Sequence, residues 1–315
     1  MSQQVSDARF QTADRRQSKL AFEIGLLMAL ALIWGSSFTL IKLALEAIPP
    51  LTITAVRVTI AALLLIAITK FNGFSLPRER STWGAFLVQG LLQSALPFTL
   101  INWGERHITS GLAGVLNATP PIFVLLIAAA TSHGRQRITL QKALGAVIGL
   151  AGVLVTIGFH SLGDVRMAAP LAQIAVLGAS LCYALAPIWG QRFSSLPPIV
   201  TAAGAMSAAA ALMLPAALIV ERPNASALTL NAILAVIVLA VLCTAVAMTI
   251  YFRLVHTLGP LGTTSGSYLR AGFAVSLGIL FLGEAFNWST IAGMALIIVG
   301  VIAVTVPLQW IRRER

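Results

Sequence analysis

Ten long apolar runs, separated by short charged segments, constrain this chain more than any other feature of its sequence. About 20 helical residues, each rising about 1.5 Å, cross a hydrocarbon core that is about 30 Å thick. Nine runs reach that length, and the first does so if Glu23 or Lys42 extends its charge toward water. The runs are continuous and not alternating, which favours helices over a barrel. They cover residues 24–41, 47–69, 81–104, 107–134, 143–163, 167–191, 193–220, 223–252, 254–283 and 285–311.

The composition places the chain in a lipid bilayer, because only 10% of its residues are charged and 58% are apolar. The formal charge of +11 does not indicate nucleic acid, since the Lys and Arg residues lie almost entirely between the runs and form no amphipathic face. Cys182 and Cys243 lie inside runs and are interpreted as packing residues. No metal-ligand spacing, cofactor motif or catalytic cluster is visible, so the sequence predicts neither an enzyme nor a metal or cofactor site.

The distribution of positive charge predicts the orientation. With the N-terminus inside, fifteen Lys and Arg residues fall on the inner side and four fall outside. This bias predicts a multi-pass protein of the inner (plasma) membrane with both termini in the cytoplasm. Residues 1–20 and 307–315 are then cytoplasmic tails, and a cleaved signal peptide with Ala29 to Ala31 as its cleavage site is the rival interpretation of the first segment.

Four landmarks recur at a spacing of about 148–149 residues, which indicates two copies of one unit. Ten spans in two copies give five spans each. Because five is odd, the second copy must enter the membrane from the opposite side, as in many secondary transporters whose substrate site lies between the halves. The landmark pairs are Trp34-Gly35 with Tyr183-Ala184, Pro49-Pro50 with Pro197-Pro198, His107 with His256, and Gly145 to Gly152 with Gly293 to Gly300.

The prediction is therefore an all-α membrane protein with ten transmembrane helices in two inverted five-helix repeats around a central cavity, over residues 21–160 and 167–306. Gly145, Gly149 and Gly152 share one helix face, as do Gly293 and Gly300. Such faces allow close helix packing, either at the edge of the bundle or between the subunits of a homodimer.

Two arginines lie within the runs, Arg57 near the middle of the second and Arg270 deep in the ninth. A charge at such depth costs about 2.5–3.5 kcal/mol on insertion scales, so both side chains should face protein or water. Each could bind an anionic or zwitterionic substrate, or could donate to carbonyls freed by a broken helix. Pro120 and Pro121 predict such a break next to Asn117, at the depth of Arg270.

Aromatic and amide residues at comparable depth could form the walls and polar contacts of a substrate pocket. The candidate substrate-binding residues are Trp34, Arg57, Gln93, Asn102, Asn117, Tyr183, Tyr268 and Arg270. No Asp or Glu lies in the middle of a run, so any proton coupling would have to involve His107, His256 or Glu284.

The motif Trp34-Gly35-Ser36-Ser37-Phe38, followed by Lys42, Pro49 and Arg57, resembles the EamA family of the drug/metabolite transporter superfamily. Gly283-Glu284, Gly293 and Gly300-Val301 resemble the end of that family's repeat, and the likeness covers residues 22–306. It implies ten helices in two inverted repeats, a cavity lined by both, and peripheral fifth and tenth helices. It also implies transport, often export, of amino acids or other small metabolites. Arg270-Ala271 and Arg135 depart from residues that are common in the family.

The sequence thus predicts a secondary transporter that exports amino acids or similar small molecules by alternating access. The alternative is a lipophilic drug or multidrug exporter in which the arginines are structural. A membrane-embedded enzyme or a scaffold is the third interpretation, which the lack of a catalytic dyad or soluble domain disfavours.

Overall fold

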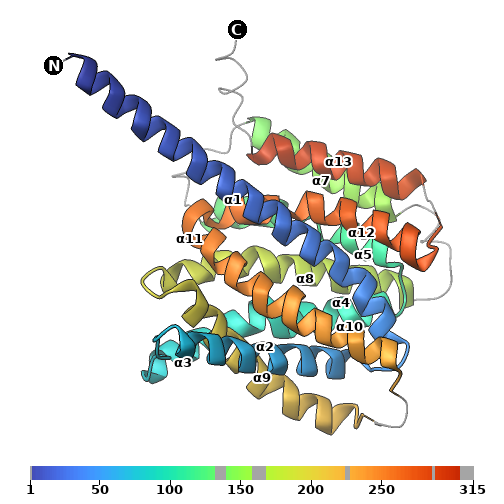
Figure 1. Cartoon of the computed structure of the whole chain (residues 1–315). Coiled ribbons are helices and arrows are strands. Elements are labelled where there is room, and N and C mark those ends of the chain that lie inside the picture. The colour runs from blue at the N-terminus through green and yellow to red at the C-terminus, as the bar shows by residue number, and fades with distance from the viewer. Residues whose placement is uncertain (1, 132–139, 158–167, 224–227, 286–287, 306–315) are drawn as a thin grey trace.

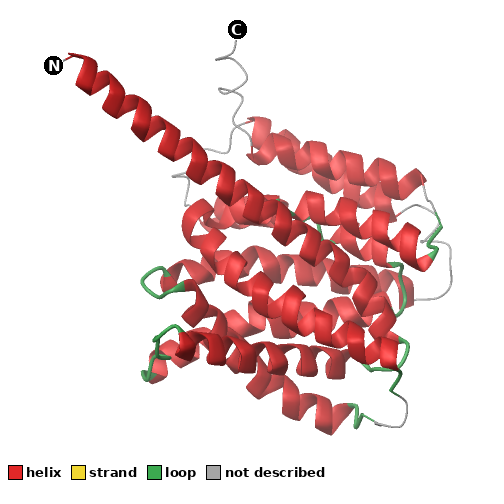
Figure 2. Cartoon of the chain, viewed as in Figure 1, coloured by secondary structure: helices red, strands yellow, loops and turns green. Residues whose placement is uncertain are grey.

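The computed structural model describes residues 2–131, 140–157, 168–223, 228–285 and 288–305, and within them it contains helices and no strand (Figures 1 and 2). The helices run side by side in one bundle. In the first half of the chain they are α1 (Ser2–Leu45), α2 (Pro50–Phe71), α3 (Arg80–Gly90), the π-helix η1 (Leu91–Ala95), α4 (Leu96–Glu105), α5 (Ser110–Leu116), α6 (Pro120–Thr131) and α7 (Leu140–Ile157).

The second half has a similar order of elements. Its helices are α8 (Ala168–Gly190), the short 3₁₀ helix η3 (Gln191–Phe193), α9 (Pro198–Val220), α10 (Leu230–Ala240), the π-helix η5 (Val241–Val246), α11 (Ala247–Ser265), α12 (Ser267–Leu282) and α13 (Trp288–Thr305). It differs in adding a short 3₁₀ helix after its first helix and in having only α12 between α11 and α13, where the first half has α5 and α6 between α4 and α7. The expected N-terminal tail is helical from Ser2 onward and continues into the body of α1, whereas the expected C-terminal tail lies outside the described residues.

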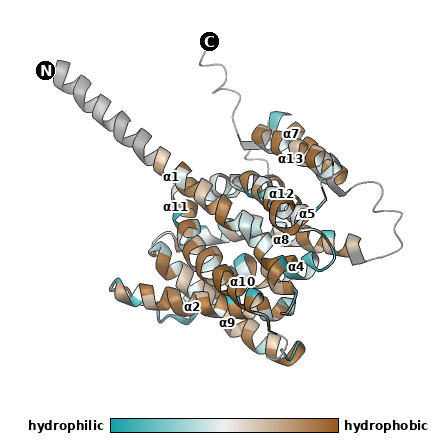
Figure 3. Cartoon of the chain, turned by 45° about the vertical axis from the view of Figure 1, so that its right-hand side comes forward, coloured by the Kyte–Doolittle hydropathy of each residue, from teal (hydrophilic) through white to brown (hydrophobic). Residues whose placement is uncertain are grey.

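Eight of the described helical segments are long and apolar enough to cross a membrane, and two shorter apolar helices, Ala143–Gly152 and Trp288–Gly300, accompany them. Large hydrophobic side chains remain exposed along the outside of the bundle, among them Leu63, Ile219 and Leu280. Figure 3 shows hydrophobic residues along the length of the helices. An apolar exterior of this extent suits lipid and not water.

The bundle has two ends, which we name by the course of α1. The near end is where the apolar part of α1 begins and α13 finishes, at the left in Figure 1. The far end is where α1 finishes and α2 begins, and where the α4–α5, α9–α10 and α12–α13 connections lie. The orientation predicted from charge would put the near end in the cytoplasm.

Proline and glycine set several helix boundaries. Pro50 and Pro198 are the first residues of α2 and α9, where proline has no need of its missing N–H. The boundary between the eighth and ninth apolar runs, which the sequence suggests near Arg253, lies instead at Gly259. Gly259 has a φ of 70° and precedes Pro260, so the helix breaks there, while Arg253 lies within α11.

The glycine faces of α7 and α13 pack against each other within this chain, and the two helices lie together at one edge of the bundle (Figures 1 and 3). A Cβ atom on Gly300 would lie 2.4 Å from the backbone nitrogen of Gly149, and one on Gly152 would lie 2.7 Å from the carbonyl oxygen of Gly293. Only glycine permits this approach. These residues are therefore used inside one molecule, and they give no support to the expected homodimer.

Candidate functional site

Arg57 projects from α2 into the interior and is 2% exposed. Its Nε donates to the hydroxyl of Thr244 at 2.6 Å, and one terminal nitrogen donates to the carbonyl oxygen of Cys243 at 3.2 Å. The guanidinium also lies 3.8 Å from the ring centre of Phe98. Both hydrogen-bonding partners belong to the π-helix η5, where the ordinary helical pairing is interrupted. The indole of Trp34 donates to the same Cys243 carbonyl at 3.1 Å.

Arg270 reaches from α12 toward the first half of the chain. One of its terminal nitrogens donates to the backbone oxygen and the side-chain oxygen of Asn117, and also to the hydroxyl of Ser267 at 3.3 Å. The guanidinium lies 5.8 Å from the ring centre of Trp34 and 5.6 Å from that of Tyr183. Aromatic faces at this distance stabilise a buried cation.

The backbone oxygen that Arg270 uses is available because the helix breaks beside it. Helix α5 ends at Leu116, Asn117 caps it, and α6 begins at Pro120. The hydroxyls of Thr119 and Ser180 donate to the carbonyl of Leu116 at 2.9 and 3.2 Å. Each buried arginine thus donates to backbone carbonyls at an irregular point in a helix of the opposite half of the chain.

Both arginines, Asn117 and the aromatic side chains near them line one small cavity. Its volume is ≈ 20 Å³, about enough for one water molecule, and a second cavity of ≈ 20 Å³ next to it shares Trp34 and Arg270. Pockets that take organic ligands usually measure about 300–1,000 Å³. The lining helices must therefore separate before such a ligand fits. The first cavity is lined by Trp34, Ser37, Phe38, Ile41, Arg57, Phe98, Ile101, Asn117, Tyr183 and Arg270.

Two buried donors at this cavity have no hydrogen-bond partner in the described part of the chain. They are Nε of Arg270 and the side-chain nitrogen of Asn117. An unpaired buried donor is costly, typically about 1–3 kcal/mol, and more for a charged group. An anionic oxygen in the cavity would relieve both costs at once.

The structure brings together five of the eight residues that the sequence suggests for substrate binding: Trp34, Arg57, Asn117, Tyr183 and Arg270. Asn102 instead donates to the carbonyl of Pro50 and the hydroxyl of Thr54, at 3.1 and 3.0 Å, and so connects α4 to the start of α2.

The other two suggested residues do not add to the cavity wall. Gln93 is buried on η1, where its amide has no partner among the described residues, and it does not line the cavity. The side chain of Tyr268 lies outside what the structure describes.

Sequence reasoning missed part of the cavity wall. Ser37 and Phe38 follow Trp34 by three and four residues, so helical spacing alone could have placed them on the same face. Phe98 and Ile101 lie on α4, and no pattern in the sequence connects that helix to Arg57 before the fold is known.

The far end of the bundle is closed by charged side chains that bind backbone groups. Nζ of Lys42 donates to the carbonyl oxygens of Glu105 and, at 2.8 Å, Ile108. The Glu284 carboxylate accepts from the N–H groups of Ser110 and Gly111 at 2.6 and 2.9 Å. We call these contacts the far-end clamp. In addition, the carboxylate of Glu221 accepts from the backbone of Leu51 and Thr52 at the start of α2.

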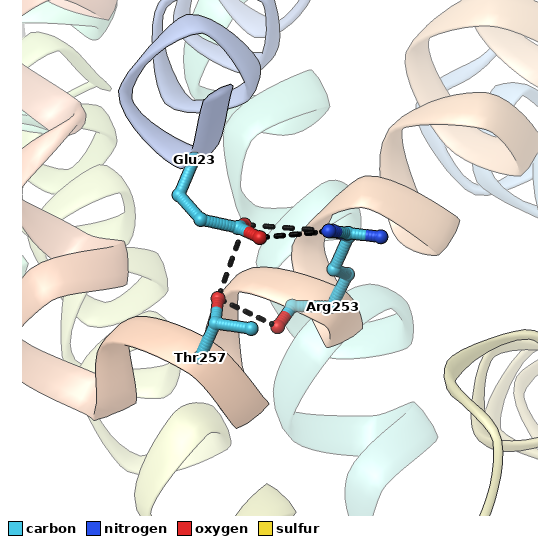
Figure 4. A network of polar contacts seen from close by, with 3 residues as sticks. All are labelled: Glu23, Arg253 and Thr257. Atoms are coloured by element: carbon cyan, nitrogen blue, oxygen red, sulfur yellow. Dashed lines mark hydrogen bonds and ion pairs between the residues drawn. The ribbon is translucent and has the colours of Figure 1, made fainter. Parts of the chain in front are cut away.

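The near end is closed differently. Glu23 of α1 accepts from Arg253 of α11 at 2.8 Å and from the hydroxyl of Thr257 at 3.2 Å (Figure 4). The Arg253 side chain is 48% exposed. This contact joins side chains only, at the surface of the bundle.

The residues suggested for proton coupling are separated in the structure. His107 is exposed at the far end, where its ring lies 5.1 Å from that of Trp103. His256 is half-buried on α11, and its Nε2 has no partner within the described segments. Both oxygens of Glu284 are occupied by backbone N–H groups.

Known proteins resemble this one over nearly its whole length. The inner membrane transporter YedA of Escherichia coli (strain K12), described as uncharacterized, is 29% identical over 282 residues, which cover 89% of this chain and 90% of YedA. The "Probable terminal-alkyne amino-acid exporter" of Streptantibioticus cattleyicolor is 26% identical over 298 residues, 94% of this chain and 97% of that protein. A solved crystal structure shares the fold with a TM-score of 0.66 at 21% identity, covering 94% of this chain and 99% of the other.

An apolar helical bundle around a buried polar cavity defines a multi-pass membrane protein of the transporter class. The model of the EamA-like transporter family matches residues 21–158 and 170–306, and this chain belongs to that family.

Proposed function

We propose that this protein is a secondary transporter that exports amino acids or similar small amphiphilic metabolites across the inner membrane by alternating access. Arg57 and Arg270 come from different halves of the chain and line one buried cavity, which is the observation that carries the proposal. Nε of Arg270 and the amide nitrogen of Asn117, which have no partner among the described residues, would bind a carboxylate. Trp34 and Tyr183 supply an apolar wall for the rest of the molecule. The relative that is named as an amino-acid exporter supports this substrate class.

The proposed architecture is ten crossings in two inverted repeats, residues 21–160 and 167–306, with both termini in the cytoplasm. Eight long spans and two shorter apolar helices are compatible with ten crossings. The π-helices η1 and η5 begin at Leu91 and Val241, a separation close to the spacing of the sequence repeat. An experimental structure in which the two halves fail to superpose after a half-turn about an axis in the membrane plane would contradict this architecture.

The transport proposal is tested with purified protein in liposomes. Radiolabelled L-amino acids, supplied as a mixture, should exchange with unlabelled amino acids inside the vesicles. Arg270→Ala should lower kcat/KM for carboxylate substrates by about 10- to 100-fold, because it removes a charged hydrogen bond worth about 1.5–3 kcal/mol. Arg106→Ala is the matched control, since Arg106 is exposed in the α4–α5 connection.

Unchanged exchange of every accepted amino acid by Arg270→Ala would contradict the role of that arginine. The competing function is export of lipophilic drugs, which the aromatic wall of Trp34, Phe98 and Tyr183 would also accommodate. Resistance of an overproducing strain to unrelated lipophilic cations would favour that function. It would speak against a carboxylate site, because two arginines that are available to bind substrate would repel cations. We expect no such resistance.

A further inference from the structure

Glu105, the last residue of α4, is a buried carboxyl group that the proposed substrate site does not use. It is 0% exposed, and neither of its side-chain oxygens has a hydrogen-bond partner in the described part of the chain. Ile101 and Ile108, about one helical turn to either side of it in sequence, belong to one buried hydrophobic cluster. A carboxylate in such surroundings, without a partner, is strongly disfavoured relative to the neutral acid.

Three charged groups on neighbouring elements act electrostatically on Glu105: Lys42 of α1, Arg57 of α2 and Glu284 of the α12–α13 connection. None of them forms an ion pair with it among the described residues. Lys42 directs its ammonium to two backbone carbonyls, and Arg57 donates to η5. Glu284 is itself negative when it binds the N–H groups of α5, and so it repels a second carboxylate.

The remaining helices that pack on α4 are α5, α8 and the π-helix η1, and none of them brings a charge. Helices α5 and α8 contain no Asp, Glu, Lys or Arg between their first and last residues. The packing against α8 is also close, since a Cβ atom on Gly104 would lie 2.8 Å from a methyl carbon of Val176. Glu105 is therefore shielded from the surface, and no cationic side chain among the described residues pairs with it in this conformation.

We propose that Glu105 is the proton-binding site that couples transport to a proton gradient. This inference rests on the proposed transport function. While the far-end clamp is closed, Glu105 carries a proton. When the far end opens, Lys42 leaves the carbonyls of Glu105 and Ile108, and water reaches the carboxyl group.

The O–H bond of Glu105 then breaks, the proton passes to water at the far end, and the carboxylate pairs with the ammonium of Lys42. The far end closes again only after a proton has returned to Glu105, so that Lys42 can bind the two carbonyls once more. A single buried acid next to a movable lysine thereby connects proton binding to the state of the far end.

The first test needs no substrate. Infrared spectroscopy of the purified protein at neutral pH should show the carbonyl stretch of a protonated carboxylic acid. The band should be missing from Glu105→Gln and retained in Glu46→Gln, which alters an exposed glutamate at the same end. Gln has the shape of the neutral acid, so Glu105→Gln should also unfold at the wild-type temperature. Wild-type protein without the band, or a band that survives in Glu105→Gln, would overturn the proposal.

The second test separates coupling from transport. In liposomes, wild-type protein should accumulate radiolabelled L-amino acids under an imposed pH gradient. Glu105→Gln should lose this accumulation completely and still exchange labelled for unlabelled amino acids across the membrane. If wild-type protein exchanges amino acids but ignores the pH gradient, the coupling proposal fails while the transport proposal stands. If it exchanges none, the proposed substrate class fails, and the infrared band alone decides whether Glu105 holds a proton.

Discussion

At the far end of the bundle charged side chains bind backbone groups, whereas at the near end one carboxylate binds other side chains. Lys42 and Glu284 each contact two consecutive or nearby peptide groups at the α4–α5 connection. Glu23 binds Arg253, which is 48% exposed, and Thr257. Backbone groups cannot turn toward water without distorting a helix end, but exposed side chains can. In this conformation the far end should therefore be the more costly of the two to open.

The largest effect should follow from Glu284→Ala. This change leaves the N–H groups of Ser110 and Gly111 without an acceptor, at about 1–3 kcal/mol each when they are buried. We expect a loss of about 2–4 kcal/mol, measured as a lower thermal unfolding temperature of the protein in detergent. Glu46→Ala, at an exposed position of the same end, should unfold like the wild type. Equal unfolding temperatures for the two variants would remove the distinction between the ends.

A smaller effect should come from crowding the far-end clamp. A Cβ atom on Gly278 would lie 2.5 Å from Oε2 of Glu284 and 2.8 Å from the hydroxyl oxygen of Ser110. Gly278→Ala should cost about 1–3 kcal/mol, because the Glu284 carboxylate can move aside only by weakening its bonds to the N–H groups of Ser110 and Gly111. Gly266→Ala is the matched control at the other terminus of α12. There the nearest atom, 2.9 Å away, is a terminal methyl carbon of Leu27, which can rotate aside. A control that destabilises as much as Gly278→Ala would show that α12 tolerates no added methyl group anywhere.

The smallest effect should come from the near end. Arg253, one partner of the near-end pair, is 48% exposed, and ion pairs that water reaches are typically worth about 0.2–1 kcal/mol and weaken with salt. Glu23→Gln should therefore change the unfolding temperature little, and the small difference from wild type should shrink further in high salt. A loss as large as that of Glu284→Ala would mean that the near end is closed as firmly as the far end.

Some features of the site follow directly from the sequence. Arg57 and Arg270 could be assigned to the interior because a charge in the middle of an apolar run cannot face lipid. The neighbours Pro120 and Pro121 mark a break in a helix for a similarly local reason, since proline cannot donate to the helical ladder. The two arginines, together with Asn117 beside the proline pair, are three of the ten residues that line the cavity.

Other features could not be read in this way. The π-helices η1 and η5 contain neither glycine nor proline, so nothing local distinguishes them from ordinary helix. The sequence places Glu105 just past the end of an apolar run, because charges usually mark such ends. Its complete burial depends on how the α4–α5 connection packs against Lys42 and Glu284, which are distant in sequence. The same reasoning predicts a boundary between two membrane spans near Arg253, and this prediction is wrong. Arg253 lies within α11, where its charge forms an ion pair with Glu23.

The π-helix η1 also has a consequence for how this chain tolerates deletions. Each residue of an α-helix turns the chain by about 100°, and a π-helical turn contains an extra residue. Loss of one residue between Leu91 and Ala95 would therefore remove the bulge and leave an ordinary turn, so that α4 keeps nearly its present phase relative to α3. Loss of one residue from the regular turns of α3 has no such compensation, and it would turn Phe98 away from Arg57 and Asn102 away from the start of α2. The bulge is thus a place where this helix can shorten by one residue without turning Phe98 out of the cavity wall.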